Sequence, residues 1–443
     1  MSDRPKNQAD PRLRATQALV LIEQDGQGSQ AALRHVLDLQ PPLAGPDRGL
    51  CTELVYGVLR RRRALDRWLE PSCRQGLYDL EEPALALLRL GALQLADLRV
   101  PPHAAVHATV ETAKRVLPHK QIGFIHAVLR SLAQRMLTGD RPDDRDLPDW
   151  LARRVATWAA RTRVDPVALE RALSQPAPLF VHALDGDRAR LATELAEEGV
   201  VIEALDGLNA PGVGRVADGR FLQSQVFADR RALAQDAASA AVVEWLAEWL
   251  ETQPSKHVAD IAAGHGVKSA RLVHTGADVT AIDTNGDKLL HAVQLCEQIG
   301  HPLGATITGD ATKELGIAHG TFDAILLDAP CTALGTLRRR PELRHRRMAA
   351  DILRMADLQA RLLKQAAKWL RPGGVLVYAV CSFTEEEGPL QIAEFLAEHK
   401  DFQRLPGDSP WLDGWLDDHG DLVSTTVRGG VDGFFAARLQ KIA

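Results

Sequence analysis

Residues 326–331 read Leu-Leu-Asp-Ala-Pro-Cys, and residues 377–382 read Val-Tyr-Ala-Val-Cys-Ser. Each stretch is a short apolar run of the kind that forms a buried β-strand, and each run ends at a cysteine. In an open parallel sheet, ligands bind outside the carboxyl ends of the strands. If the two strands are neighbours, one pocket holds Asp328, Cys331 and Cys381, and its thiols are candidates for nucleophilic chemistry.

The strands around these two stretches alternate with helical segments from about residue 221 onward. Strands are expected at 257–262, 278–283, 305–308, 322–328 and 375–381, followed by a late antiparallel strand near 433–439. Such alternation is typical of a doubly wound α/β domain. We therefore predict a Rossmann-like α/β domain over residues 221–443.

The chain before this domain has a different pattern. Apolar residues recur at helical spacing through residues 10–137, which predicts an all-α domain. A polar, proline-bearing segment at 138–148 reads as a linker, and two short strand candidates flank a helix near 187–197. At 443 residues the chain is too long for one core. We expect three domains: helical at 1–140, small α+β at 141–220, and α/β at 221–443.

Composition excludes several classes of protein. The chain is 45% hydrophobic and 25% charged, as in ordinary globular proteins. No apolar run approaches the roughly 18 residues of a membrane helix, and residues 1–8 lack the apolar stretch of a signal peptide. The five cysteines form no Cys-x-x-Cys pair, which argues against a metal site and against a disulfide framework. These features predict a cytoplasmic protein without a membrane partner.

The net charge of −5 hides local basic regions. Residues 1–140 carry 19 Lys and Arg against 15 Asp and Glu, so this part is positively charged. Residues 338–347 contain six arginines in ten positions. Local basic patches make the electrostatic contacts with phosphates. A solvated helix face is the alternative reading of the 338–347 cluster, and its place just after Cys331 favours RNA contact.

The turn after the first α/β strand is rich in small residues and has two glycines. Small residues let the backbone approach a ligand, and the next helix offers its N-terminus. A P-loop needs glycine directly before Lys-Ser, where this chain has Val267, and the Gly-x-Gly-x-x-Gly dinucleotide fingerprint is absent. The predicted cofactor-binding residues of this turn are Ala262, Ala263, Gly264, His265, Gly266, Val267 and Lys268.

Aspartates follow at the ends of successive strands. Asp283 comes about 20 residues after the glycine turn, where a carboxylate can accept both hydroxyls of a ribose. Asp310 follows the third strand and is placed to bind an adenine amino group, and Asp328 ends the fourth strand. A single aspartate in such a place is as often a helix N-cap. This ordered set fits S-adenosylmethionine better than NAD.

The motifs resemble those of the bacterial 16S rRNA cytosine-C5 methyltransferase B (Sun) family, within the RNA 5-methylcytosine methyltransferases. Residues 328–332, with Gly335 and the arginines after it, are similar to the fourth family motif. Residues 378–382, with the glutamates at 385–387, are similar to the sixth. Residues 10–137 are similar to the NusB-like helical domain of that family. The glycine turn departs from the family pattern Cys-Ala-Ala-Pro-Gly-Gly-Lys but keeps Lys268.

The resemblance implies a class I methyltransferase that uses S-adenosylmethionine on carbon 5 of a cytosine in 16S rRNA, at position 967. Pro330-Cys331 taken alone suggests the nucleophile of DNA cytosine methyltransferases. The family resemblance instead assigns attack on the base to Cys381 and product release to Cys331, and Asp328 stabilises the activated ring. The residues expected to contact RNA are Arg338, Arg339, Arg340 and Arg344.

Two other functions remain open at this point. One is an RNA-binding or antitermination-like protein whose altered glycine turn no longer holds a cofactor. The other is a methyltransferase of the same chemistry that acts on tRNA or on another rRNA site. For the main interpretation we expect a monomer that acts on unassembled or partly assembled 16S rRNA.

Overall fold

The computed structural model describes residues 10–73, 76–98, 100–139, 145–205, 207–407 and 409–442. Its contacts divide the chain into two compact units. Unit 1 comprises Met1–Asp149 with Arg338–Arg346, and unit 2 comprises Trp150–Leu337 with Arg347–Ala443. The expected boundary between residues 140 and 141 lies outside the described residues, as do residues 1–8.

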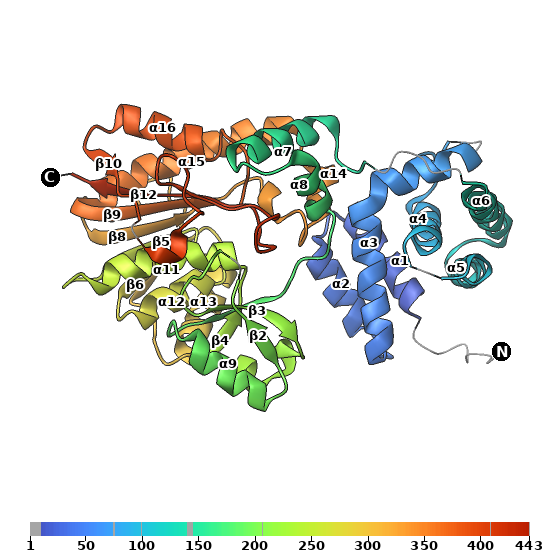
Figure 1. The fold of residues 1–443 in the computed structure, drawn as a ribbon, viewed down its shortest axis with the longest axis horizontal. Helices are drawn as coiled ribbons and strands as arrows, with labels where there is room; N and C mark the ends of the chain where they lie inside the picture. Colours follow the sequence, from blue (N-terminus) through green and yellow to red (C-terminus); the bar gives the residue numbers. More distant parts are fainter. Residues whose placement is uncertain are drawn as a thin grey trace. The chain divides into compact units, whose positions relative to one another are not determined.

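Unit 1 is helical, as predicted. Its helices are α1 (Pro11–Glu23), α2 (Ser29–Asp38), α3 (Gly45–Leu69), the short η1 (Glu70–Ser72), α4 (Glu82–Ala96), α5 (Pro102–Val116), α6 (His119–Leu137) and the short α14 (Leu343–Arg346) (Figure 1). Every residue of α4 from Ala84 to Gln94 is buried, so this helix forms the centre of the bundle. Its one buried cation, Arg89, forms a bidentate pair with Asp66 at 2.8 and 3.0 Å.

The small sheet of unit 2 confirms the predicted α+β insert. It is antiparallel with the order β2-β3-β1-β4, and α9 (Arg188–Glu197) packs against it. Its strands are β1 (Phe180–Ala183), β2 (Val201–Glu203), β3 (Val213–Asp218) and β4 (Ala232–Ala234). Strands β1 and β2 and the helix between them match the predicted elements, whereas β3 and β4 were not predicted. Because β4 belongs to this sheet, the sheet extends past residue 220, beyond the expected end of the insert. Two short helices, η2 (Phe221–Gln223) and α10 (Gln225–Ala228), lie between β3 and β4.

The larger sheet of unit 2 is a mixed Rossmann-like sheet with the order β10-β12-β9-β8-β5-β6-β7, and β11 pairs with β12. Its strands are β5 (His257–Ile261), β6 (Asp278–Asp283), β7 (Ala305–Thr308), β8 (Phe322–Asp328), β9 (Leu370–Val380), β10 (Phe402–Arg404), β11 (Leu422–Val423) and β12 (Phe435–Lys441). Strands β5 to β9 run parallel, and β12 is antiparallel to β9, which confirms the predicted late strand.

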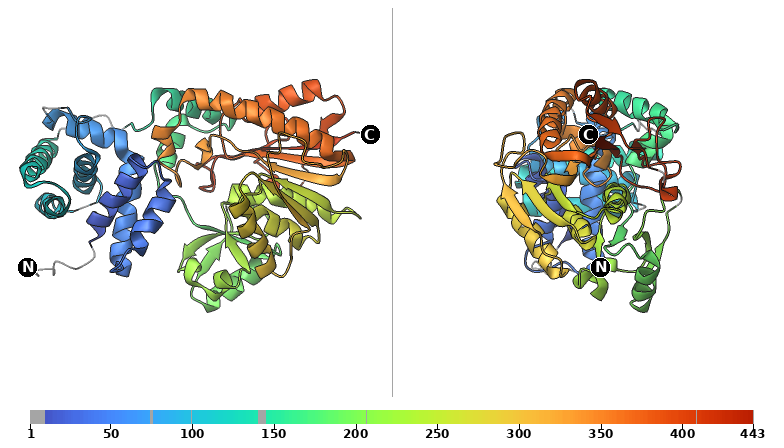
Figure 2. Two further views of the ribbon diagram at one scale, coloured as in Figure 1. Left: turned by 180° about the vertical axis from the view of Figure 1, so that it is seen from behind. Right: turned by 90° about the vertical axis from the view of Figure 1, so that its left-hand side faces the viewer.

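Helices cover both faces of this sheet. Figures 1 and 2 show α15 and α16 on one face and α11, α12 and α13 on the other. The helices of unit 2 are α7 (Asp149–Arg161), α8 (Pro166–Leu173), α11 (Ala237–Glu251), α12 (Val267–His274), α13 (Gly286–Gln298), the short η3 (Leu334–Thr336), α15 (Ala349–Trp369), α16 (Pro389–Glu398) and the short η4 (Pro410–Leu412). Among the described residues, no helix has the length and apolar character that crossing a bilayer requires.

A buried polar cluster joins the small sheet to the helices of the large one. His182 on β1 lies with its Nε2 atom 2.7 Å from Glu244 on α11 and its Nδ1 atom 2.9 Å from Gln235. Arg271 on α12 binds both oxygens of the same glutamate, at 2.5 and 3.0 Å. Because these groups satisfy one another, the cluster fixes the insert without leaving a buried charge unpaired.

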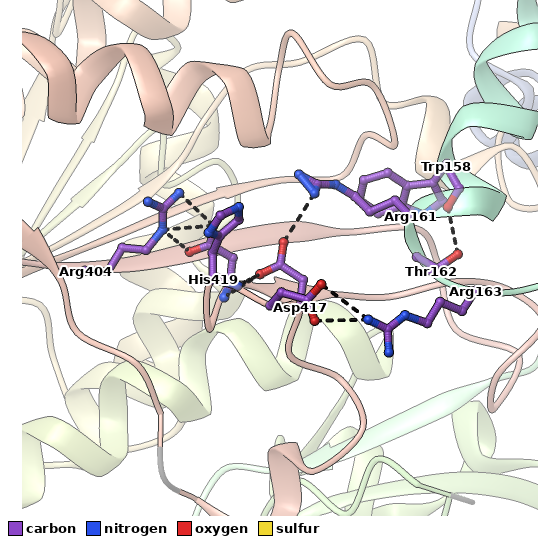
Figure 3. Close-up of polar contacts among 9 residues, drawn as sticks. Trp158, Arg161, Thr162, Arg163, Arg404, Asp417 and His419 are labelled. Carbon is purple, nitrogen blue, oxygen red and sulfur yellow. Dashed lines mark hydrogen bonds and ion pairs between the residues drawn. The ribbon is translucent and has the colours of Figure 1, made fainter.

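Helix α7 anchors the segment that leads into β12. Arg161 at its end lies 3.4 Å from Asp417 (Figure 3), and Arg163, just after the helix, lies 3.0 Å from Asp418. At the far end of the same segment, Arg404 binds both oxygens of the buried Asp421. These pairs hold the segment between β10 and β11 in place.

Candidate active site

Two thiols meet at the carboxyl ends of β8 and β9. Asp328 on β8 is paired in parallel register with Ala379 on β9. Cys331 follows Asp328 by three residues and Cys381 follows Ala379 by two, so both cysteines lie just beyond this pair. Their Sγ atoms lie 3.3 Å apart, within hydrogen-bond distance. The prediction that the two strands are neighbours and bring their cysteines together is therefore confirmed.

A close backbone approach holds the loop after Cys331. Gly335 donates its N–H to the Cys381 carbonyl at 3.0 Å, and its own carbonyl accepts from Gly433 at 2.9 Å. A Cβ atom on Gly335 would lie 1.8 Å from the Gly433 oxygen, so only glycine fits there. The loop from β8 is thus tied to the end of β9 and to the C-terminal segment.

The five cysteines fall into two groups. Cys331 and Cys381 are half-buried, whereas Cys51, Cys73 and Cys296 are buried. Burial raises the pKa of Cys51 and Cys296 to about 12 and that of Cys73 to about 11, which makes these three thiols unreactive at neutral pH. The three are structural, and the pair at the strand ends is the place for thiol chemistry.

The two paired thiols are not equivalent. The hydrogen bond with Cys381, together with burial, raises the pKa of Cys331 well above its ordinary value. Cys331 therefore keeps its proton at neutral pH. A thiol is a poor nucleophile compared with a thiolate.

The glycine turn after β5 has an unusual backbone. Gly264 and Gly266 have φ angles of 58° and 78°, and Ala262 has a φ of 61°, a rare conformation for a residue with a Cβ atom. Gly264 donates its N–H to Asp283 at 2.9 Å, which links the turn to the end of β6. Backbone held in such a conformation is common at ligand sites.

A cavity of about 450 Å³ opens beside this turn, at the carboxyl ends of β5, β6 and β8. Small-molecule sites have volumes of this order. Five of the predicted cofactor residues line it: Ala262, Gly264, Asp283, Asp310 and Asp328. Its lining does not include the other five, which are Ala263, His265, Gly266, Val267 and Lys268.

The acids of the cavity have free acceptor capacity. Each Asp283 oxygen accepts one backbone N–H, from Gly264 and from Asn285, and a carboxylate oxygen can accept two hydrogen bonds. Hydrogen bonds from the side chain and backbone of Thr312 lower the pKa of Asp310, so it is charged at neutral pH. Acids on one side and the apolar Leu358 and Leu362 on the other suit a polar ribose attached to a flat apolar base.

Lys268 serves this cavity indirectly. Its Nζ atom lies 2.6 Å from Asp328, between the glycine turn and the cysteine loop. Burial alone would lower the pKa of Lys268, but the charge and hydrogen bond of Asp328 outweigh that effect and the pKa is raised. Lys268 is therefore a charged partner that orients Asp328 rather than a wall of the cavity.

Asp260 lies fully buried beneath the same turn, at the end of β5. Burial raises its pKa to about 7, against the opposing hydrogen bond from Ser269. The Asp260 carboxyl is thus close to half-protonated at neutral pH. Because it lies beneath the glycine turn, the charge under that turn changes with pH in this range.

The arginine-rich segment is divided by its burial. Arg344 is fully buried and donates to the Arg60 carbonyl at 3.0 Å and to Asp146 at 3.1 Å, all within unit 1. Arg338 is buried as well. Both side chains are buried in this structure, and their contact with RNA remains an untested prediction. Arg340 is 45% exposed and Arg339 half-buried, and their contact with RNA stays a prediction.

Several residues of the site had no role assigned to them from the sequence. Lys288, Leu358 and Leu362 line the cavity, and only the helical spacing of the two leucines could have pointed to them. Glu387 is fully buried and hydrogen-bonded to both cysteine loops. In the sequence it was recognised only as one of the glutamates at 385–387 that accompany the sixth family motif, with no role assigned to it.

Comparisons with known proteins agree with this geometry. Residues 247–440 match the family model "16S rRNA methyltransferase RsmB/F", and residues 9–134 match the NusB family. The chain is 35% identical over 431 residues to ribosomal RNA small subunit methyltransferase B of Thermus thermophilus, covering 97% of this chain and 98% of that protein. It is 34% identical to the protein of that name from Xylella fastidiosa strain Temecula1, with the same coverage.

Solved structures share the fold. The structure of PH0851 superposes with a TM-score of 0.78 at 22% identity, covering 98% of this chain and 99% of that one. A methyltransferase homolog protein from Pyrococcus horikoshii matches 67% of this chain and all of its own length, with a TM-score of 0.53 at 22% identity.

Proposed function

Because this chain belongs to the ribosomal RNA small subunit methyltransferase B family, we propose that it methylates carbon 5 of a cytosine in 16S rRNA with S-adenosylmethionine as methyl donor. The observation that carries the chemistry is the pair of thiols 3.3 Å apart beside a cavity of cofactor size. Position 967 is the target that the family assignment favours.

The reaction needs a thiolate because carbon 5 of cytosine is a poor nucleophile. When a thiolate adds to carbon 6, the electron pair of the ring double bond moves to carbon 5. Carbon 5 then takes the methyl group, and the sulfur that carried it keeps the bonding pair and leaves as a neutral thioether. Removal of the carbon 5 proton and cleavage of the bond from carbon 6 to the enzyme sulfur restore the ring. Covalent catalysis thereby divides one difficult step into easier ones.

Cys381 is the attacking residue in this proposal, and Cys331 is the residue of product release. The raised pKa of Cys331 supports this division, since a thiol that holds its proton at neutral pH is a poor nucleophile. Once Cys381 is bound to carbon 6, its charge and its hydrogen bond no longer raise the pKa of Cys331. With that effect removed, the Cys331 thiol can lose its proton to water, and the resulting thiolate can accept the carbon 5 proton.

Asp328 lies between the thiols and the cofactor cavity, because it lines that cavity and precedes Cys331 by three residues. A carboxyl group at this position is suited to bind the ring N3 and amino group of the activated cytosine. Lys268 fixes the orientation of Asp328 through its 2.6 Å ion pair.

The residues around the glycine turn fit S-adenosylmethionine, which supplies a methyl group on a positively charged sulfur. The N–H groups of the turn, Asp283 and Asp310 would hold its amino acid part, ribose and base in that order along the strand ends. The turn lacks the Pro and one Gly of the family pattern, and Ala262, Gly264 and Gly266 in it have positive φ angles.

The RNA must present one base to this pocket, out of any stack. We propose that Arg339 and Arg340 contact its phosphates and that the protein acts as a monomer, in the cytoplasm, on 16S rRNA that is unassembled or partly assembled. Phosphate contacts of this type weaken steeply with salt.

Two measurements test the proposal. Isothermal titration with S-adenosylmethionine should give saturable binding, and no detectable heat would favour an RNA-binding protein with a defective cofactor site. Bisulfite sequencing of rRNA and tRNA from a deletion strain should show one cytosine in 16S rRNA losing its methyl group. Loss of a tRNA signal, or of a signal elsewhere in rRNA, would move the substrate to that site.

A further inference from the structure

A single buried carboxylate lies between the two cysteine loops. Glu387 is fully buried and accepts five hydrogen bonds. One oxygen accepts from the Thr332 N–H at 2.7 Å and from Gln359 at 3.2 Å. The other accepts from the hydroxyls of Thr332, Ser382 and Thr384 at 2.5, 2.6 and 2.8 Å. All five groups are donors, the set that suits a carboxylate.

The bound residues flank the two cysteines directly. Thr332 follows Cys331, and Ser382 follows Cys381. Gln359 also donates to the Pro330 carbonyl at 2.9 Å, so the loop of Cys331 is held on both sides of the thiol. The Thr332 and Ser382 hydroxyls lie 3.1 Å apart and converge on the same Glu387 oxygen.

No cation pairs with this carboxylate among its hydrogen-bonding partners within the described residues. Burying an unpaired carboxylate is costly, and here the cost is met by hydroxyl and amide donors alone. Its neighbour Glu386 instead forms an ordinary, partly exposed ion pair with Arg154 at 2.6 Å. The chain therefore offers a matched control one residue away.

We propose that Glu387 is a positioning residue, which sets the separation of the Cys331 and Cys381 sulfur atoms by tying the two loops to one carboxylate. The effect on catalysis rests on the proposed function, in which Cys381 attacks and Cys331 releases the same base. Glu387 hydrogen-bonds to neither thiol, so it positions them through the loops, and its charge also contributes to the raised pKa of Cys331. Displacement of a reacting group by about 1 Å typically lowers a rate on the order of 100-fold.

The first test needs no methylation. Diamide, a diazene oxidant, accepts two electrons and two protons from the pair of thiols and leaves a disulfide and a hydrazine. We expect Glu387→Gln to form the Cys331–Cys381 disulfide at least about 10-fold more slowly than the wild type, because the loops lose their common anchor. Glu386→Gln should match the wild type. Equal rates in the Glu387 variant and the wild type would overturn the proposal.

The second test separates positioning from a general loss of structure. We expect Glu387→Gln to lower kcat roughly 10- to 100-fold while KM for S-adenosylmethionine and for RNA changes less than about 2-fold. A fall in activity that only tracks the fraction of unfolded protein would contradict a positioning role. If this variant does not fold, Thr332→Val, which removes one hydroxyl and keeps the backbone bond, should show the same changes at smaller size.

The two hypotheses fail in different ways. Slow disulfide formation in Glu387→Gln, together with a wild type that methylates no RNA, would keep the positioning role and refute the proposed function. Disulfide formation at the wild-type rate in Glu387→Gln, together with a wild type that methylates RNA, would refute the positioning role and keep the proposed function.

Discussion

Replacing Arg344 by methionine should destabilise unit 1 rather than simply weaken RNA binding. Its guanidinium is fully buried and donates to Asp146 and to the Arg60 carbonyl. Asp146 is itself buried, and its second oxygen accepts from the Ala64 N–H at 3.1 Å. Methionine fills much of the same volume, so the main loss is the partner of a buried carboxylate.

The size of the effect follows from that loss. Removing one partner of a buried ion pair costs about 3–5 kcal/mol. Burial already raises the pKa of Asp146, so protonation of the unpaired carboxyl relieves part of the cost, and we take about 3 kcal/mol. That free energy corresponds to a roughly 150-fold change in the equilibrium for opening the structure, at about 1.4 kcal/mol for each factor of ten.

Hydrogen–deuterium exchange with mass spectrometry measures this opening locally. Amides of α3 around Ala64 should exchange on the order of 100-fold faster in Arg344→Met, and Arg340→Met, which alters an exposed side chain, should leave them unchanged. Adding Asp146→Leu to Arg344→Met should restore much of the protection, because the unpaired charge is gone. Unchanged exchange in Arg344→Met, with weaker RNA binding, would refute the structural role.

Three further predictions concern titration and thiol reactivity. Burial, together with Arg62 and Arg344, lowers the pKa of His345 to about 3, so the unfolded chain binds a proton below about pH 6.5 that the folded chain refuses. Unit 1 should therefore lose stability as the pH falls from about 6.5 toward 3, and His345→Asn should reduce this dependence of its amide exchange. For Asp260 the sign is opposite: its folded pKa of about 7 lies above the value of about 4 expected when unfolded, so stability is full below about pH 4 and is lost as pH rises through 7. Asp260→Asn should flatten that loss in thermal unfolding between about pH 5 and pH 8. Iodoacetamide at about pH 8 should modify Cys381 before Cys331, and both before the three buried cysteines, which peptide mass spectrometry resolves.

The fold was largely predictable because its strands carry strong local signals. The apolar runs ending at Asp328 and Cys381 and the strand near 433–439 were all found, and the structure pairs them as neighbours. Strands β3 and β4 were not predicted, because β4 is short and β3 alternates weakly, with exposed residues at Ala217 and Asp218. Their strand character comes from pairing with β1, which a single sequence does not reveal.

Site residues that directly follow a strand could be predicted from the sequence. Residues whose role depends on whether their side chain is buried could not. The thiols, Asp283 and Asp328 could be placed from their positions after strands. Arg344 could not, because an arginine in a basic run has the same sequence signal whether it binds phosphate or a buried aspartate. Glu387 was equally hidden, since its five donors come from three different segments of the chain.

The roles of the two cysteines are tested most directly by trapping the covalent intermediate. Purified Cys331→Ala and Cys381→Ala variants would be incubated with 16S rRNA and S-adenosylmethionine, and protein–RNA adducts would be resolved by denaturing electrophoresis. The account predicts a stable adduct with Cys331→Ala, which attacks but does not release, and neither adduct nor methylation with Cys381→Ala. An adduct that accumulates in Cys381→Ala and is absent in Cys331→Ala would contradict it and reverse the two roles.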